Sequence, residues 1–385
     1  MSFHDTDLPA GAPARLTIDL TAIRDNVIRL KELAGAAEVM AVVKGDAYGH
    51  GLVPSAQAAV HGGATWLGVA QLAEAIALRD AGIETRVLSW LHAPGLDFTP
   101  GLERDIDFGV PAEWELTELA AAARRIGRPA RVQLKVDTGL ARNGAYGADW
   151  PRLIQAAQPL SAEGVIEVVG VFTHFAFADS PDHPTVRAQQ EKFADAVRDV
   201  ERAGFPIEVR HMSNSAATLT RPSAAWDMVR PGLAVYGLSP VPQLGDPASF
   251  GLRPAMTASA NITVTKRIPA GQGVSYGHTY VPEKETTVVD VPAGYADGVP
   301  RAASNVGPVQ VAGVRHTVSG RVCMDQFVVD VGDQQVQAGD RVVLFGPGDG
   351  GEPTAQDWAD ATDTISYEIV TRMSSRLPRI YEGDM

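Results

Sequence analysis

One lysine ends an apolar segment near the N-terminus and is the first residue with a chemical interpretation. Residues 39–44 read VMAVVK, so the charged Lys44 closes a run that is otherwise apolar. Burying a charged lysine at such a position costs free energy unless its amine reaches solvent or takes part in binding or chemistry. Two interpretations stay open, a surface lysine and an amine whose depressed pKa allows it to form a Schiff base.

Further polar residues stand at or just after the ends of later apolar runs. They are His174, Ser213, Asn214, Ser215, Arg230 and Gly232. In a parallel barrel the carboxyl ends of the strands surround the active site, so these residues are candidates for the same site as Lys44. Taken alone, a histidine at a strand end is more often a hydrogen-bonded structural residue than a catalytic one.

Short apolar runs alternate with amphipathic stretches between residues 39 and 235. The runs are residues 39–44, 65–70, 86–91, 106–110, 131–137, 166–174, 208–213 and 228–232. Most are continuously apolar, which is typical of strands buried on both faces in a parallel sheet. The stretches between them have helical patterns that end near glycine. We predict an α/β fold with an N-terminal (β/α)8 TIM-type barrel. A Rossmann-like open sheet is the alternative, but no GxGxxG follows the first strand.

The pattern changes after residue 254. Short strand-like runs separated by Gly, Pro and Asp predict a mostly β C-terminal domain, with helical patterns only at residues 354–361 and 365–372. The runs are residues 261–268, 286–295, 309–318, 326–331 and 340–346. The Pro- and Gly-rich stretch at residues 239–254 is the predicted boundary. We therefore divide the chain into residues 1–252 and 253–385, leaving open whether the first residues join the β domain.

Composition excludes several classes of protein. The chain has 385 residues, a formal net charge of −13 and one cysteine. An acidic chain is a poor match for nucleic acid or an anionic membrane, and one cysteine forms no internal disulfide. No basic and apolar leader opens the sequence, and no apolar run is long enough to span a membrane. These features predict a cytoplasmic protein, and no cluster of residues predicts a metal site.

A series of motifs resembles the alanine racemases, which are pyridoxal 5'-phosphate enzymes. The motifs cover nearly the whole chain in order. Those in the first predicted domain are residues 41–51 (AVVKGDAYGHG), 135–144 (KVDTGLARNG), 173–179 (THFAFAD), 214–217 (NSAA) and 229–238 (VRPGLAVYGL). Those in the second are residues 273–280 (GVSYGHTY), 294–301 (GYADGVPR), 320–326 (GRVCMDQ), 365–371 (ISYEIVT) and 376–381 (RLPRIY).

The resemblance implies a two-base interconversion of L- and D-alanine, which supplies D-alanine for peptidoglycan. Lys44 matches the lysine that binds the cofactor and serves one face of the substrate, and Tyr276 matches the base of the other face. His174 and Arg230 match the network that assists the tyrosine. Arg230 also matches the arginine bonded to the pyridine nitrogen, and because a guanidinium does not give up its proton, the ring stays a weaker electron sink.

The remaining matches concern binding. The family's cofactor-holding positions correspond to Tyr48, Arg142, Asn214, Ser215, Gly232, Leu233 and Tyr367. Its substrate-binding positions correspond to Arg142, Tyr276, Tyr295 and Met324. Lys135 matches a lysine that is often carbamylated, with an ordinary ion-pairing lysine as the alternative. Because the family brings the tyrosine and methionine from a neighbouring subunit, the resemblance also implies a homodimer with shared active sites.

Three other functions are compatible with parts of the sequence. An amino acid decarboxylase of the same cofactor class normally places an acid at the pyridine nitrogen, which disagrees with Arg230. A racemase of serine or of many amino acids differs only in substrate, and its broad-specificity members are commonly exported. A barrel protein that only carries pyridoxal phosphate leaves the second domain without a role.

Overall fold

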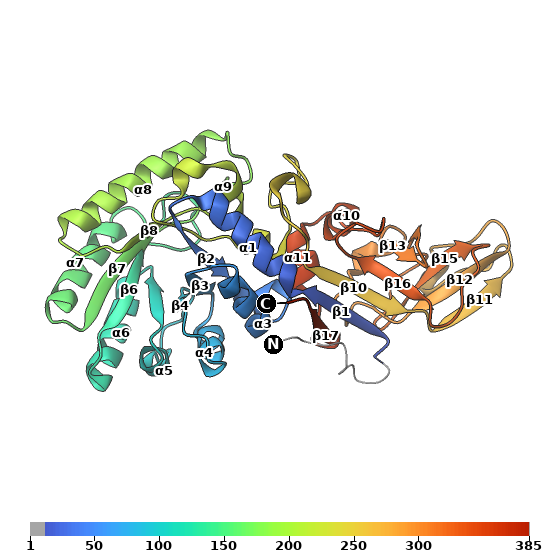
Figure 1. Cartoon of the computed structure of the whole chain (residues 1–385), viewed down its shortest axis with the longest axis horizontal. Helices are drawn as coiled ribbons and strands as arrows, with labels where there is room; N and C mark the ends of the chain where they lie inside the picture. The colour runs from blue at the N-terminus through green and yellow to red at the C-terminus, as the bar shows by residue number, and fades with distance from the viewer. Residues whose placement is uncertain (1–11, 385) are drawn as a thin grey trace. The chain divides into compact units, whose positions relative to one another are not determined.

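The computed structural model describes residues 12–384, which form two compact units. One unit holds Ile23–Ala47 and Leu52–Leu252, and the other holds residues 12–22, Tyr48–Gly51 and 253–384. We call them the barrel unit and the β unit (Figure 1). The β unit is thus built from both ends of the chain and one short internal segment. Within the described residues, no helix has both the length and the apolar character that crossing a membrane requires.

Eight parallel strands close into a barrel in their order along the chain. β2 (Glu38–Val42) pairs with both β3 (Trp66–Val69) and β9 (Met228–Val229), which closes the cylinder. The other strands are β4 (Arg86–Ser89), β5 (Asp107–Val110), β6 (Ala130–Lys135), β7 (Ile166–Phe172) and β8 (Val209–His211). Their side chains are almost all buried, as expected for strands covered on both faces. The predicted TIM-type barrel is confirmed.

Amphipathic helices cover the outer face of the barrel, as Figure 1 shows for α6, α7 and α8. In α8 (Pro184–Arg202), the residues Val186, Phe193, Val197 and Val200 are buried. This spacing of three, four or seven residues puts them on one face of the helix. The other helices of this region are α1 (Leu20–Ala34), α3 (Leu52–His61), α4 (Leu72–Asp80), α5 (Thr99–Glu103), α6 (Glu113–Ile126), α7 (Asp149–Ala162) and α9 (Ser215–Thr220).

The barrel interior is filled with large side chains. One buried cluster consists of Met40, Trp66, Leu88, Val209 and Met228, and the partly buried Trp90 packs against it. These residues come from strands on the two sides of the β2–β9 closure or lie just after β4. The barrel is therefore a packed core, and chemistry is left to the residues that follow its strands.

The β unit contains two sheets. The larger has the order β14-β13-β16-β10-β1-β17, and the smaller has the order β11-β12-β15. β1 (Ala14–Asp19) lies between β10 (Met256–Asn261), to which it is antiparallel, and β17 (Arg379–Glu382), to which it is parallel. The other strands are β11 (Val264–Ile268), β12 (Thr286–Val291), β13 (Pro308–Val311), β14 (Val314–Thr317), β15 (Phe327–Gly332) and β16 (Arg341–Phe345). Two helices, α10 (Ala355–Ala361) and α11 (Ser366–Thr371), form where their patterns predict them.

The structure corrects three local predictions. The first barrel strand ends at Val42 and not at Lys44, and β7 ends at Phe172 and not at His174. The single run predicted over residues 309–318 is a hairpin of β13 and β14, because Ala312 and Gly313 have positive φ angles and turn the chain. β10 was not predicted, since its sequence MTASAN has little of the apolar character that marks a strand.

Candidate active site

Lys44 stands at the start of an unusual turn beyond β2. The four residues that follow it, Gly45, Asp46, Ala47 and Tyr48, have φ angles of 65°, 53°, 55° and 54°. Left-handed backbone is common only for glycine, so three consecutive non-glycine residues in this region require support from their surroundings. Part of that support is the hydrogen bond from the Ala47 amide to the Val43 carbonyl at 2.8 Å.

The Lys44 amine lies within the barrel unit among other cations. Its nitrogen is 5.9 Å from the centre of the Trp90 ring, and no hydrogen bond or ion pair joins it to another of residues 12–384. Burial lowers the pKa of Lys44, and Arg142 and Arg230 lower it further, while the carboxylate of Glu74 raises it. At neutral pH the neutral fraction of this amine is therefore larger than for an exposed lysine. The neutral amine is the form that reacts with an aldehyde.

A second buried lysine belongs to the same cluster. Burial lowers the pKa of Lys135 to about 7, and the charges of Arg230, Arg142 and Lys44 act in the same direction, against Asp137. The Lys135 nitrogen is 5.4 Å from the centre of the Phe172 ring. The structure thus brings together three of the predicted barrel cations around Lys44. Such a concentration of positive charge is a site for anions.

Arg230 is held by a network inside the barrel. Its Nη2 donates to the Thr173 carbonyl at 2.7 Å and to His174 Nδ1 at 3.4 Å, and its Nη1 donates to His211 Nδ1 at 2.9 Å. Burial lowers the pKa of Arg230 to about 9, which leaves it a cation at neutral pH. The predicted pair of His174 and Arg230 is therefore in contact, with His174 as the weaker of the two histidine partners.

His211 and Gln133 complete this network and were missed by the sequence analysis. Arginine has only donors, so His211 Nδ1 must accept and its proton must sit on Nε2. Nε2 then donates to Gln133 Oε1 at 2.6 Å. Burial and Arg230 hold the pKa of His211 well below its usual value, and its ring stacks on Phe172 at 5.0 Å. Their signal in the sequence is weak, because β6 (ARVQLK) and β8 (VRH) each contain other polar residues.

Hydrogen bonds through the Ser215 hydroxyl join the segments that follow β8 and β9. The Ser215 hydroxyl accepts from the Gly232 amide at 2.8 Å and from the Ala234 amide at 3.2 Å, and Asn214 caps α9 by accepting from the Ala217 amide. Because the Ser215 oxygen accepts two bonds, its own proton remains to donate. Leu233 follows Gly232 directly and is fully buried. The structure therefore joins the predicted residues of these two loops.

Two further predicted residues meet within the β unit. The rings of Tyr48 and Tyr367 are 6.2 Å apart, centre to centre. Burial, assisted by Tyr367, raises the pKa of Tyr48, which keeps its phenol protonated. The backbone is tightly packed here, since a Cβ on Gly49 would lie 2.4 Å from the Val370 carbonyl oxygen. The Tyr48 phenol is therefore held in its protonated form within a tightly packed segment.

Tyr276, Tyr295 and Met324 also belong to the β unit, on neighbouring loops. The Tyr295 amide donates to the Cys323 carbonyl at 3.0 Å, and the Ser275 hydroxyl donates to the Arg321 carbonyl at 2.7 Å. The exposed fractions of Tyr276, Tyr295 and Met324 are 71%, 42% and 54%. Large side chains this exposed and this close together mark a surface that meets another molecule.

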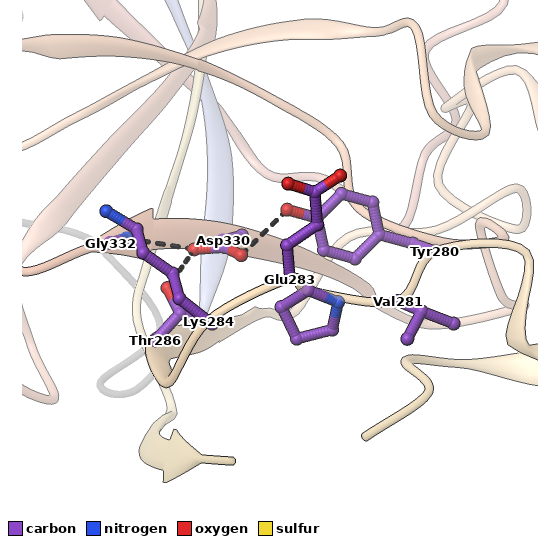
Figure 2. Close-up of a pocket in the computed structure, with 8 residues that line it drawn as sticks. Tyr280, Val281, Glu283, Lys284, Thr286, Asp330 and Gly332 are labelled. Carbon is purple, nitrogen blue, oxygen red and sulfur yellow. Dashed lines mark hydrogen bonds between the residues drawn. The ribbon is translucent and has the colours of Figure 1, made fainter. Parts of the chain in front are cut away.

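The turn that carries Tyr276 is fastened at its base. The Val274 amide donates to the Tyr280 carbonyl at 3.0 Å, and the Tyr280 hydroxyl donates to Asp330 Oδ2 on β15 at 2.7 Å. Asp330 also accepts from Thr286 and from the Gly332 amide (Figure 2). These residues line an open pocket of about 670 Å³ that contains none of the predicted site residues.

Across residues 12–384, no group of three or more His, Cys, Asp or Glu is arranged to hold a metal.

Comparison with known proteins agrees with this arrangement. Two family models match, the alanine racemase N-terminal domain over residues 18–240 and the alanine racemase C-terminal domain over residues 255–381. The chain belongs to the alanine racemase family. The alanine racemase of Frankia casuarinae is 58% identical over 98% of this chain and 100% of its own, and that of Salinispora arenicola is 58% identical over 96% and 99%.

Solved structures of alanine racemases have the same fold. The enzyme of the D-cycloserine producer Streptomyces lavendulae matches with a TM-score of 0.96 and 53% identity over 98% of each chain. The enzyme of Clostridium difficile 630 matches with a TM-score of 0.88 and 33% identity over 96% of each chain. The predicted family and the predicted enzyme class, an amino acid racemase, are confirmed. The roles of individual residues stay predictions.

Proposed function

We propose that this racemase interconverts L- and D-alanine with pyridoxal 5'-phosphate, using Lys44 and Tyr276 as bases on opposite faces of the substrate. The observation that carries the proposal is the partly buried Lys44 amine, which has no hydrogen-bond partner within residues 12–384 and whose pKa is lowered by burial and neighbouring cations. Inverting Cα requires one base to remove a proton and another to return one from the other side. An aldehyde cofactor requires a free amine of this kind.

The residues of the barrel unit fit that cofactor. The cluster of Lys44, Lys135, Arg142 and Arg230 suits an anionic ligand, and the Ser215 hydroxyl has a proton to donate to a phosphate. When bound, the cofactor supplies the electron sink that makes the Cα proton removable. The barrel unit would hold its phosphate through the Ser215 hydroxyl beside Gly232 and Leu233. In the alanine racemase family the positions that match Tyr48 and Tyr367 also hold the phosphate.

The polar groups around the ring position would control protonation. Arg230 stays charged at neutral pH and has no lone pair or acidic proton to exchange with a ring nitrogen, so we propose that it donates a hydrogen bond there. His174 and His211 both have pKa values held well below the usual range by burial and by Arg230. They therefore act as neutral acceptors that orient the guanidinium. Arg142 supplies positive charge for the carboxylate of alanine.

The exposed tyrosines and methionine lead to the proposal of a homodimer. Tyr276, Tyr295 and Met324 are too exposed to be part of a closed site within one β unit. We propose that a second copy of the chain covers them and that each site takes Lys44 from one copy and Tyr276 from the other. The family's role in supplying D-alanine for peptidoglycan places the reaction in the cytoplasm in this proposal.

The reaction is tested by following the circular dichroism of L-alanine with the purified holoenzyme. We expect the signal to decay to zero with the wild-type protein and to remain with Lys44→Ala. Racemisation that survives Lys44→Ala would overturn the mechanism. Serine in the same assay tests substrate breadth, and rescue of a bacterium that requires D-alanine tests the biological role.

The shared site is tested by mixing two inactive variants. If sites are shared, a dimer of one Lys44→Ala chain and one Tyr276→Phe chain contains one site with both native bases. Random exchange then restores about a quarter of the wild-type sites. If each chain provides its own Lys44 and Tyr276, the mixture stays inactive although the dimers form.

A further inference from the structure

Glu74 binds backbone groups on two adjacent barrel loops. Its Oε1 accepts from the Gly45 amide at 2.6 Å, and its Oε2 accepts from the Ala70 and Gln71 amides at 3.1 and 3.0 Å. Ala70 and Gln71 follow β3 and begin α4, while Gly45 is the residue directly after Lys44. The bond to the Gln71 amide is the ordinary capping bond, in which the third residue of a helix accepts from the amide of the residue before the helix. The bond to the Gly45 amide has no part in capping α4.

The Gly45 bond stabilises the least favourable stretch of backbone near the site. Gly45 to Tyr48 are all left-handed, and the non-glycine residues among them do not adopt this conformation without support. Glu74 secures the first amide of the turn. Asp46 Oδ1 accepts from the Leu52 amide at 2.8 Å and secures the other end. The direction of the Lys44 side chain is set by this turn, because its Cα is adjacent to the Gly45 amide.

We infer that Glu74 is a positioning residue for Lys44, acting through the turn that begins at Gly45. It does not touch the reacting atoms. Its carboxylate also brings a negative charge to the cationic cluster. This inference rests on the proposed function of Lys44 in catalysis, but the contacts themselves belong to the protein without cofactor.

The electrostatic effect of Glu74 has a definite sign. The groups that act on the Lys44 amine or are acted on by it are Glu74, Lys135, Arg142, His174 and Arg230. Of these, only Glu74 is an acid, and it favours the protonated amine. Replacing it by glutamine therefore lowers the pKa of Lys44 further. The geometric effect is separate, since glutamine has one oxygen and cannot accept from amides on both loops.

The first test uses the apo-protein. Hydrogen exchange of the peptide covering residues 41–52 should be faster in Glu74→Ala by about tenfold or more, with a smaller increase in Glu74→Gln. Acetylation of lysines at a series of pH values, followed by mass spectrometry, gives the titration midpoint of Lys44. We expect a lower midpoint in Glu74→Gln, with the exposed Lys192 on α8 as the internal reference.

The second test uses the holoenzyme. We expect Glu74→Ala to reduce kcat for racemisation by about tenfold or more with little change in KM, because a misdirected base slows the proton transfer. Asp357→Asn is the matched control, since Asp357 also caps a helix from its third position, in α10 of the β unit. It should leave kcat and the 41–52 peptide unchanged.

The outcomes separate the two proposals. Unchanged exchange of residues 41–52 together with a kcat within twofold of wild type in both Glu74 variants would overturn the positioning role. If the wild-type holoenzyme fails to racemise alanine, the proposed function is wrong, while exchange and the Lys44 titration in the apo-protein still decide what Glu74 does.

Discussion

Replacing Ser215 by alanine should weaken the binding of pyridoxal phosphate much more than replacing Ser213. The two serines are two residues apart and both buried, but they use their hydroxyls differently. Ser213 donates its proton to the Ala224 carbonyl at 2.6 Å, whereas Ser215 accepts from the Gly232 and Ala234 amides and keeps its proton. Only the Ser215 proton is available to a phosphate.

The magnitude follows from the kind of bond that is lost. A hydrogen bond to a charged group contributes about 1.5–3 kcal/mol, so Ser215→Ala should raise the Kd of the cofactor about 10- to 150-fold. Each variant also leaves buried backbone groups without partners, at a cost of about 1–3 kcal/mol per group. That cost falls on two amides in Ser215→Ala and on one carbonyl in Ser213→Ala, so both apo-proteins should be less stable than wild type.

The assay has two parts. Titration of apo-protein with pyridoxal phosphate, followed by protein fluorescence or cofactor absorbance, gives the Kd. Urea unfolding of each apo-protein gives the stability. The reasoning is refuted if Ser215→Ala binds the cofactor within twofold of wild type, or if Ser213→Ala weakens binding as much as Ser215→Ala does.

Three other predictions concern Lys135, Gln133 and Tyr280. Lys135 has a pKa of about 7 in the folded protein and 10.5 in the unfolded chain, so between these pH values the unfolded state binds more protons and the free energy of unfolding rises with pH. Lys135→Met should flatten that rise, measured by urea unfolding of the apo-protein in CO2-free buffer. An unchanged slope of stability against pH would contradict this prediction. Gln133→Leu should remove the acceptor of the His211 Nε2 proton, which should lower kcat about tenfold or more and shift the ¹⁵N resonances of the His211 ring. Unchanged resonances would show that Gln133 does not set the tautomer of His211. Tyr280→Phe should loosen the base of the turn carrying Tyr276, which should speed hydrogen exchange of the peptide covering residues 273–281 and reduce kcat, and unchanged exchange would contradict this reasoning.

The barrel is predictable because its strands are apolar throughout and recur with helices between them. The rule that active sites follow barrel strands then selects Lys44, His174, Ser215 and Arg230 from their positions in the sequence. The same rule does not select His211 or Gln133, which lie within strands and face inward. The strands β6 (ARVQLK) and β8 (VRH) contain other polar residues as well, so the sequence alone does not show which of them face the site.

Two features near Lys44 were out of reach for another reason. The left-handed turn is made by Asp46, Ala47 and Tyr48, none of which signals that conformation, so it exists because Glu74 and the surrounding fold impose it. Glu74 itself appears in the sequence as one more acid on an amphipathic helix. Tyr276 was identified through the family motif alone, because an exposed tyrosine in a β-rich segment has no distinguishing local pattern.

The position of β1 has a consequence for how the chain is made. β1 (Ala14–Asp19) pairs with β10 (Met256–Asn261) and β17 (Arg379–Glu382), both of which are synthesised after the whole barrel unit. The barrel is thus inserted between the first strand of the other unit and that strand's partners. During synthesis, the eight strands of the barrel unit can pair with one another while β1 is still without its partner strands. The Asp384 amide donates to Thr21 Oγ1 at 3.1 Å, so residues 21 and 384 of the β unit are in contact. A circular permutant that links residue 384 to residue 12 and opens between residues 252 and 253 would make the β unit continuous except for Tyr48–Gly51, which would stay within the barrel sequence.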